Sequence, residues 1–117
     1  MVQEGKIVLF PFPNTDQTRG KLRPALVLCR CPSQYDDWLI CMISSQLAQY
    51  MADLDEIVDE GDDDFDTSGL KRTSLVRVTR LAVVSSSIFL GSTGEISKTR
   101  LARIKQKLAA WILAQVM

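Results

Sequence analysis

Short apolar segments separated by polar turns fill most of the chain, and they predict a protein built mainly of β-strands. Apolar and β-branched residues in these segments either alternate with polar ones or run together, as in half-buried and buried strands. The predicted strands are residues 6–10, 25–31, 38–43, 54–58, 74–78 and 81–84. Residues 74–79 alternate cleanly, with Leu75, Arg77 and Thr79 on one face and Val76 and Val78 on the other. Acidic residues in segment 54–58 favour an edge position for that strand.

One helix is predicted near the end of the chain, after Ser97, whose side chain suits a helix N-cap. Apolar residues then recur at helical spacing, so one stripe of this helix is expected to be buried. The stripe consists of Leu101, Ile104, Leu108, Trp111 and Ile112 and ends at the polar Gln115. Turns or loops are predicted at 31–34, 61–69 and 91–94, and a short helix or irregular crossover at 45–52.

Several short strands and a single terminal helix predict a small twisted sheet or partly closed barrel, with the helix packed on it. A chain of 117 residues fits one domain, over residues 1–117. No apolar run approaches the roughly 20 residues that cross a bilayer, and the N-terminus shows no signal pattern. We therefore expect a cytoplasmic protein without membrane segments.

The net charge is zero, with 14 basic and 14 acidic residues, but the charges are segregated. Nine acidic residues and no basic one lie between Asp53 and Asp66, whereas nine basic residues and one acidic one, Glu95, lie between Lys71 and Lys107. The second segment predicts a basic face able to meet nucleic acid, the alternative being an ordinary solvated surface. The acidic run from Asp59 to Asp66 lacks the glycine of an EF-hand loop, so it is interpreted as a solvated loop.

Three cysteines, Cys29, Cys31 and Cys41, lie in or beside apolar strand-like segments. They are interpreted as small buried hydrophobic residues of a protein from a reducing compartment. Because a metal site needs more ligands and the chain contains no histidine, we expect no metal site. No cofactor is predicted.

Arg23 directly precedes Pro24, at the start of a predicted strand. Proline pushes the preceding residue to extended geometry, so Arg23 is held on a defined backbone. A long cation placed there predicts an anionic ligand, and phosphate is the commonest one. The alternative is a surface arginine beside a strand.

Several segments, in this order, resemble the MazF/PemK-like toxins of type II toxin–antitoxin systems. They are residues 5–13 (GKIVLFPFP), 21–28 (KLRPALVL), 43–46 (ISSQ), 69–71 (GLK), 74–78 (SLVRV) and 94–97 (GEIS). The resemblance implies an SH3-like barrel of the MazF/PemK/CcdB type, a homodimer and an antitoxin protein as partner. It also implies a sequence-specific, metal-independent endoribonuclease (an mRNA interferase) that cleaves single-stranded RNA.

Site residues follow from the same resemblance. Arg23 matches the family's catalytic arginine, and its permanent charge suits a phosphate clamp. Ser44 stands where the family usually carries a threonine; its hydroxyl can bond a phosphate oxygen, or it can simply form a turn. The other predicted RNA-binding residues are Asp16, Lys21, Ser45, Gln46, Arg77 and Thr79.

One departure from the family keeps a second function open. Part of the family has an Arg-x-Asp pattern where this chain has Arg77-Val78-Thr79, so the carboxylate is absent. Asp16 is a candidate substitute base, although a turn aspartate that bonds its own backbone is as good an interpretation. The alternative function is a non-catalytic family member that binds RNA, an antitoxin or a protein target such as gyrase.

Overall fold

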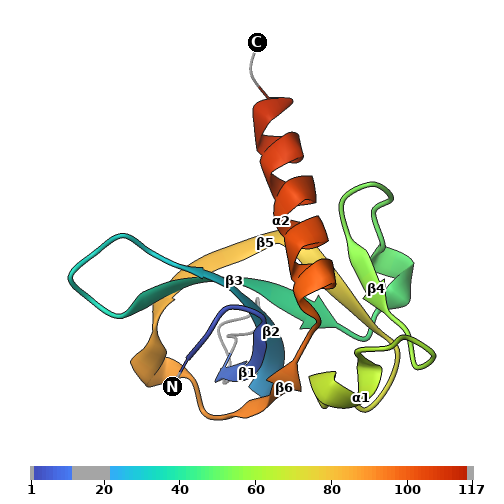
Figure 1. The fold of residues 1–117 in the computed structure, drawn as a ribbon, viewed down its shortest axis with the longest axis horizontal. Coiled ribbons are helices and arrows are strands. Elements are labelled where there is room, and N and C mark those ends of the chain that lie inside the picture. The colour runs from blue at the N-terminus through green and yellow to red at the C-terminus, as the bar shows by residue number, and fades with distance from the viewer. Residues whose placement is uncertain (1, 12–21, 116–117) are drawn as a thin grey trace, which may run out of the picture.

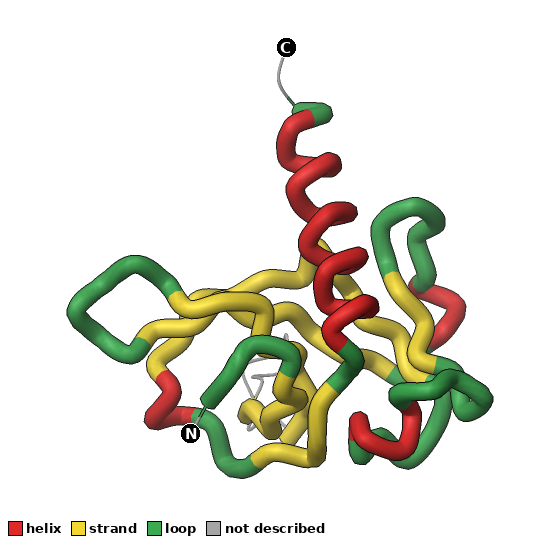
Figure 2. Tube along the Cα trace, in the orientation of Figure 1, coloured by secondary structure: helices red, strands yellow, loops and turns green. Residues whose placement is uncertain are grey.

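A computed structural model of the protein describes residues 2–11 and 22–115. Within them, six strands form one antiparallel sheet in the order β4-β5-β3-β2-β1-β6. The strands are β1 (Lys6–Pro11), β2 (Leu22–Arg30), β3 (Asp37–Ser44), β4 (Glu56–Val58), β5 (Ser74–Ser85) and β6 (Ser92–Glu95). The sheet curls into a half-barrel, and the C-terminal helix stands against it (Figures 1 and 2). The mainly β fold with a terminal helix and the edge position of β4 are therefore confirmed.

Apolar side chains project from both faces of the curled sheet, because successive strand residues point to opposite faces. Leu26 belongs to a cluster that is closed by Ile104 and Leu108 of helix α2 (Lys98–Leu113). Its neighbour Ala25 belongs to a second cluster on the opposite face. The sheet is thus buried on two sides, which explains why several strands read as continuous apolar runs.

β5 unites two strands that were predicted separately. Met42 of β3 lies opposite Arg77 and Cys41 lies opposite Leu81, so residues 78–80 form a bulge between them. The backbone N–H of Val78 in this bulge donates to Oδ1 of the buried Asp55, at 3.1 Å. A carboxylate from the acidic segment thereby replaces the missing ladder partner.

Two of the predicted loops contain regular structure. Residues 61–69 include the short helix α1 (Phe65–Ser68), and most of the turn predicted at 91–94 is strand β6. Segment 45–52 contains one 3₁₀ turn, Leu47–Gln49. Elements of three or four residues carry too little periodic signal to be detected from the sequence.

Helix α1 packs closely on β6 because glycine occupies both contact points. A Cβ at Gly94 would lie 2.0 Å from the carbonyl oxygen of Thr67, and one at Gly69 would lie 2.0 Å from that of Thr93. Gly69 also ends α1 in the left-handed region, at φ 71°. This contact fixes where the chain leaves α1 toward β5.

Helix α2 begins as predicted and is less buried than predicted. The Ser97 side chain accepts the N–H of the residue three positions on, at 3.1 Å. Ile104 and Leu108 are buried, but Trp111 is 41% exposed and Ile112 52%. The last turns of α2 extend beyond the sheet, so only the first half of the predicted stripe is covered (Figure 1). Neither helix of the described chain has the length and apolarity needed to span a membrane.

Candidate active site

A cleft of about 480 Å³ opens beside the start of β2, the end of β3 and the segment that leads from α1 into β5. Its volume falls within the range of roughly 300–1,000 Å³ that is typical of small-ligand sites. Apolar, hydroxyl and cationic side chains line it together. The lining residues are Leu9, Arg23, Pro24, Ile43, Ser44, Ser45, Gln46, Gly69, Leu70, Lys71, Arg72, Ser74 and Thr93.

Arg23 is the second residue of β2, on the extended backbone that Pro24 predicts. It lies opposite Phe10 of β1, and Pro24 lies opposite Leu9. Its side chain is exposed, lines the cleft and forms no ion pair within residues 2–11 and 22–115. A permanent positive charge at this position is available for an anion.

Ser44 closes β3 on the same side of the sheet as Arg23. Ala25 of β2 pairs with Met42 of β3, and continuing this register by two residues brings Arg23 opposite Ser44. Side chains in such positions start about 5 Å apart. Ser44 Oγ accepts a hydrogen bond from the backbone N–H of Gln46 at 3.0 Å, so Ser44 has the turn-forming role that was its alternative interpretation. Because this bond uses Oγ as acceptor, the hydroxyl hydrogen can still be donated to an anion.

The other predicted RNA-binding residues fall into three groups. Ser45 and Gln46 are exposed and line the cleft. Arg77 and Thr79 do not line it, although Arg77 pairs with Met42 and so shares the sheet face of Ser44. Two residues, Asp16 and Lys21, lie outside the described residues.

Two cations of the cleft, Lys71 and Arg72, were not assigned to the site from the sequence. The segment between Gly69 and β5 carries both of them into the lining. Resemblance to the family at residues 69–71 was the available signal. It indicated a matching segment but not that this segment would fold beside Arg23.

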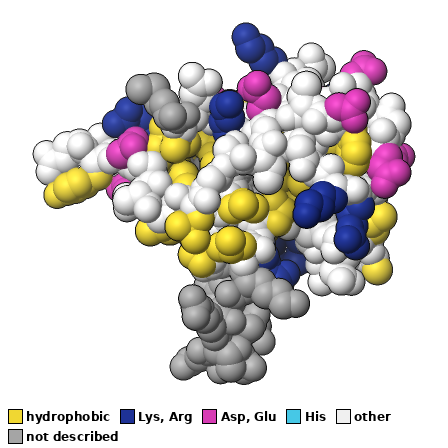
Figure 3. All heavy atoms as spheres, turned by 90° about the horizontal axis from the view of Figure 1, so that it is seen from below, with side chains coloured by type: hydrophobic (Ala, Val, Ile, Leu, Met, Phe, Trp, Pro, Cys, Tyr) yellow, Lys and Arg dark blue, Asp and Glu magenta, His cyan; other side chains and the backbone are white. Residues whose placement is uncertain are grey.

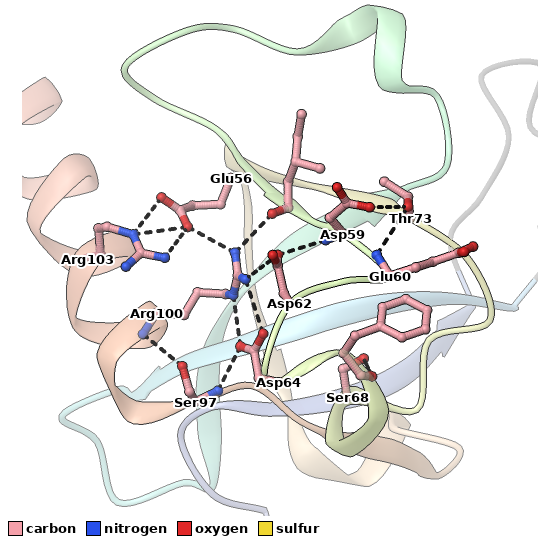
Figure 4. Close-up of polar contacts among 12 residues, drawn as sticks. Glu56, Asp59, Glu60, Asp62, Asp64, Ser68, Thr73, Ser97, Arg100 and Arg103 are labelled. Atoms are coloured by element: carbon pink, nitrogen blue, oxygen red, sulfur yellow. Dashed lines mark hydrogen bonds and ion pairs between the residues drawn. The ribbon is translucent and has the colours of Figure 1, made fainter.

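Part of the acidic run 59–66 folds onto α2 (Figure 4). Asp59, Glu60, Asp63 and Asp66 are exposed, as a solvated loop predicts, but Asp64 is buried and Asp62 is half-buried. Arg100 is only 8% exposed and meets three carboxylates. Its Nε donates to Asp64 at 2.8 Å, its Nη2 to Asp62 at 2.8 Å, and its Nη1 to Glu56 at 3.1 Å. A buried guanidinium requires such partners, because an unpaired charge in the interior is strongly unfavourable.

Hydrogen bonds hold these carboxyl groups in the ionised form. Burial alone would raise the pKa of Asp64, but hydrogen bonds from Arg100 and the backbone N–H of Ser97 outweigh it and lower that pKa. Burial would also raise the pKa of Glu56, but the hydrogen bonds from Arg103 and Lys107 outweigh it and lower that pKa. The pKa of Asp62 is lowered by the backbone N–H of Asp59 and then by Arg100. Such carboxylates are poor proton acceptors, so they serve the fold rather than acid–base chemistry.

Four of the five cations of α2, all except Lys98, form ion pairs, which removes most of the charge of this helix from the predicted basic face. Glu56 accepts from Arg103 Nη2 at 2.9 Å and from Lys107 Nζ at 2.6 Å, and Lys105 pairs with Glu4. Between residues 71 and 107, five cations form no ion pair with a described residue. They are Lys71, Arg72, Arg77, Arg80 and Lys98.

The cysteines are free thiols. Cys41 is buried in the core as predicted, whereas Cys29 and Cys31 are half-buried. Burial raises the pKa of Cys41 and of Cys29, so both stay protonated near neutral pH. Within residues 2–11 and 22–115, no three His, Cys, Asp or Glu side chains are grouped so that they could hold a metal ion.

The described chain is thus a curled β half-barrel with a terminal helix and a cleft lined by Arg23, Lys71 and Arg72. A sequence model of the PemK-like, MazF-like toxins of type II toxin–antitoxin systems matches residues 3–112, and the chain belongs to this family. A comparison with curated protein sequences finds no match.

Solved structures with the same fold include three relatives of low sequence identity. An endoribonuclease in complex with its cognate antitoxin, from a mycobacterial species, is 12% identical, with TM-score 0.70 over 100% of this chain and 99% of that one. The Mycobacterium tuberculosis toxin MazF-mt6 is 15% identical, with TM-score 0.67 over 92% and 95%. MazF in a MazE–MazF crystal structure from Deinococcus radiodurans is 19% identical, with TM-score 0.66 over 95% and 94%.

Proposed function

We propose that this toxin is an endoribonuclease that cleaves single-stranded RNA in the cytoplasm, at particular sequences and without a metal ion. The observation that carries the proposal is that Arg23 and Ser44 line the same cleft. One supplies a permanent charge and the other a hydroxyl donor, and together they suit a phosphodiester.

The chemistry that fits these groups is an internal transesterification. The ribose 2′-oxygen attacks the neighbouring phosphorus, and the bond from phosphorus to the 5′-oxygen of the next nucleotide breaks. A base takes the 2′-hydroxyl proton, and the leaving 5′-oxygen gains one. Arg23 and Ser44 stabilise the additional negative charge on the phosphorane oxygens. The products are a 2′,3′-cyclic phosphate and a 5′-hydroxyl end.

The residue that acts as general base is not among the described residues that line the cleft. No carboxylate lines the cleft among the described residues, and Thr79, at the position of the family carboxylate, lies outside the lining. We propose Asp16 as the base, because it precedes Arg23 by only seven residues in the chain. Thr79 in place of the family carboxylate, in a chain without histidine, is the feature that favours the second candidate function, a family member that binds RNA, an antitoxin or a protein target without cleaving.

Two partners are part of the proposal. We propose an antitoxin protein that neutralises this chain, since two of the similar structures are toxin–antitoxin complexes. We propose a homodimer as well, because α2 exposes apolar side chains at its C-terminal end.

The test is cleavage of a long single-stranded RNA by the purified protein in excess EDTA. The expected result is a set of discrete fragments with 5′-hydroxyl ends that can be labelled directly by a polynucleotide kinase. A 2′-deoxy nucleotide at the mapped cleavage position should abolish cutting there and nowhere else. Intact RNA that nevertheless binds the protein would favour the non-catalytic alternative.

A further inference from the structure

Among the described residues, the lining of the cleft carries more positive charge than one phosphodiester can neutralise. Arg23 enters it from β2, whereas Lys71 and Arg72 enter it from the segment before β5. All three side chains are exposed, and none forms an ion pair with a residue that the structure describes. Lys and Arg side chains gather around a hollow bordered by apolar side chains on the face seen in Figure 3.

These cations lie on two sides of Ser44. In the sheet, β3 lies between β2 and β5, so β2 and β5 are two strand spacings apart, about 10 Å. Arg23 belongs to β2, whereas Lys71 and Arg72 belong to the segment that enters β5. A phosphodiester bound between Arg23 and Ser44 carries a single negative charge. Lys71 and Arg72 are therefore left for another anion further along the ligand.

The segment that carries Lys71 and Arg72 is held at both ends (Figure 4 shows the Thr73 contacts). At its start, the N–H of Leu70 donates to Ser68 Oγ at 3.1 Å. At its end, Ser74 Oγ donates to the carbonyl oxygen of Arg72 at 2.8 Å, and Thr73 Oγ1 donates to Asp59 Oδ1 at 3.0 Å. A fixed backbone lowers the ordering entropy lost when a ligand binds.

We infer that Lys71 and Arg72 bind the phosphate adjacent to the one held by Arg23 and Ser44, so that the site takes a strand with flanking phosphates in preference to a dinucleotide. This inference rests on the proposed function, since it presumes RNA in the cleft. Apolar residues of the same lining, including Pro24, Ile43 and Leu70, offer a surface for a sugar and base.

The test compares the double variant Lys71→Ala/Arg72→Ala with Arg30→Ala/Lys98→Ala, which removes the same charge. Lys98 forms no described ion pair, and Arg30 makes only an exposed contact with Asp36 at 3.7 Å, at the end of β2 far from Arg23. Binding is measured with 2′-O-methylated single-stranded RNA, which cannot be cleaved. The Lys71/Arg72 variant should bind at least about tenfold more weakly than the control. The slope of its salt dependence should be shallower by about 0.7 for each phosphate that the variant no longer neutralises.

A length series separates the flanking phosphate from the scissile one. A dinucleoside monophosphate should bind both double variants equally, whereas longer strands should discriminate between them. In single-turnover cleavage, the Lys71/Arg72 variant should need more RNA for half-saturation yet reach the wild-type rate at saturation, which a distorted site would not do.

Equal binding and salt slopes for the two double variants would overturn the inference, as would an equal loss on the dinucleoside monophosphate. If the wild type cleaves RNA and the two double variants bind RNA equally, only the inference is refuted and the proposed cleavage stands. A wild type that binds without cleaving, and loses binding only in the Lys71/Arg72 variant, would refute only the cleavage. A wild type that does not bind single-stranded RNA would refute both.

Discussion

At the scale of single residues, the strongest expectation concerns Arg23. Replacing it with alanine should lower the single-turnover cleavage rate by about 10²–10³-fold, because a charged donor to the phosphorane is removed. Arg23→Lys should recover only part of the rate, since an ammonium group lacks the bidentate geometry of a guanidinium. The fold should be unaffected, as the side chain is exposed. A wild-type rate in Arg23→Ala would place the chemistry elsewhere.

The base can be located by exchanging two residues. If Asp16 accepts the 2′-hydroxyl proton, Asp16→Asn should reduce the single-turnover rate by about 10²–10⁴-fold, the usual contribution of a general base. Thr79→Asp should then change the rate little, because Thr79 does not line the cleft. A rise in rate in Thr79→Asp would assign the base to the β5 position instead. Unchanged rates in both variants would leave catalysis to Arg23 and Ser44 alone.

Local geometry explains which site residues could be predicted from the sequence. The backbone of Arg23 is set by the adjacent Pro24. Ser44 was assigned to the site only by resemblance to the family, since a serine after an apolar strand is also typical of a turn. Lys71 and Arg72 line the cleft on a segment that follows α1, and α1 packs on β6, about 25 residues away in the chain. No short-range sequence pattern predicts that Lys71 and Arg72 lie in the cleft.

At the scale of elements, the contact between α1 and β6 gives a sharp stability test. Gly94→Ala should destabilise the protein by about 3 kcal/mol or more, because its Cβ would meet the backbone of Thr67. Gly61→Ala is the matched control: no atom lies within 4 Å of its Cβ position, so a change within about 1 kcal/mol is expected. Thermal unfolding of both variants provides the measurement. Equal melting temperatures would show that the backbone at β6 can move away.

The elements also show where sequence reasoning fails. The apolar stripe correctly placed Ile104 and Leu108 in the core, but it gave no sign that Arg100 would be as deeply buried. That burial depends on Asp62 and Asp64, which approach from a different part of the chain. The two halves of β5 were each detected, and their continuity was not, because the bulge at 78–80 breaks the alternation.

At the scale of the whole molecule, the ion pairs around Arg100 predict loss of stability in acid. The pKa values of Glu56, Asp62 and Asp64 are lowered in the folded protein from ordinary values of 4.5 and 3.8. The unfolded chain therefore binds protons first as the pH falls, and folding weakens from about pH 4.5 downward while it is fully supported above. Urea unfolding at pH 7, 5, 4 and 3 should show the midpoint falling mainly below pH 4.5.

Two variants assign this acid sensitivity to the Arg100 cluster. Arg100→Gln should lose about 3–5 kcal/mol at pH 7, since it leaves buried carboxylates without their cation. Asp62→Asn removes a partly exposed member and should fold readily, with a smaller fall in midpoint between pH 4.5 and 3. A pH profile identical to wild type in Asp62→Asn would show that this carboxylate does not contribute to the acid transition.

The exposed end of α2 bears on the assembly of the molecule. Trp111, Ile112 and Leu113 are 41%, 52% and 69% exposed, on turns that extend past the sheet (Figure 1). Large apolar side chains grouped in this way are typical of an interface, and a second copy of the chain would cover them. We therefore expect a dimer by sedimentation at micromolar concentration, and monomers of unchanged secondary structure in Ile112→Lys/Leu113→Lys. Tyr35→Lys is the control, because Tyr35 is 65% exposed in the loop between β2 and β3, on a different element. A monomeric wild type would refute the dimer, and a dimer that survives the double substitution would place its interface elsewhere.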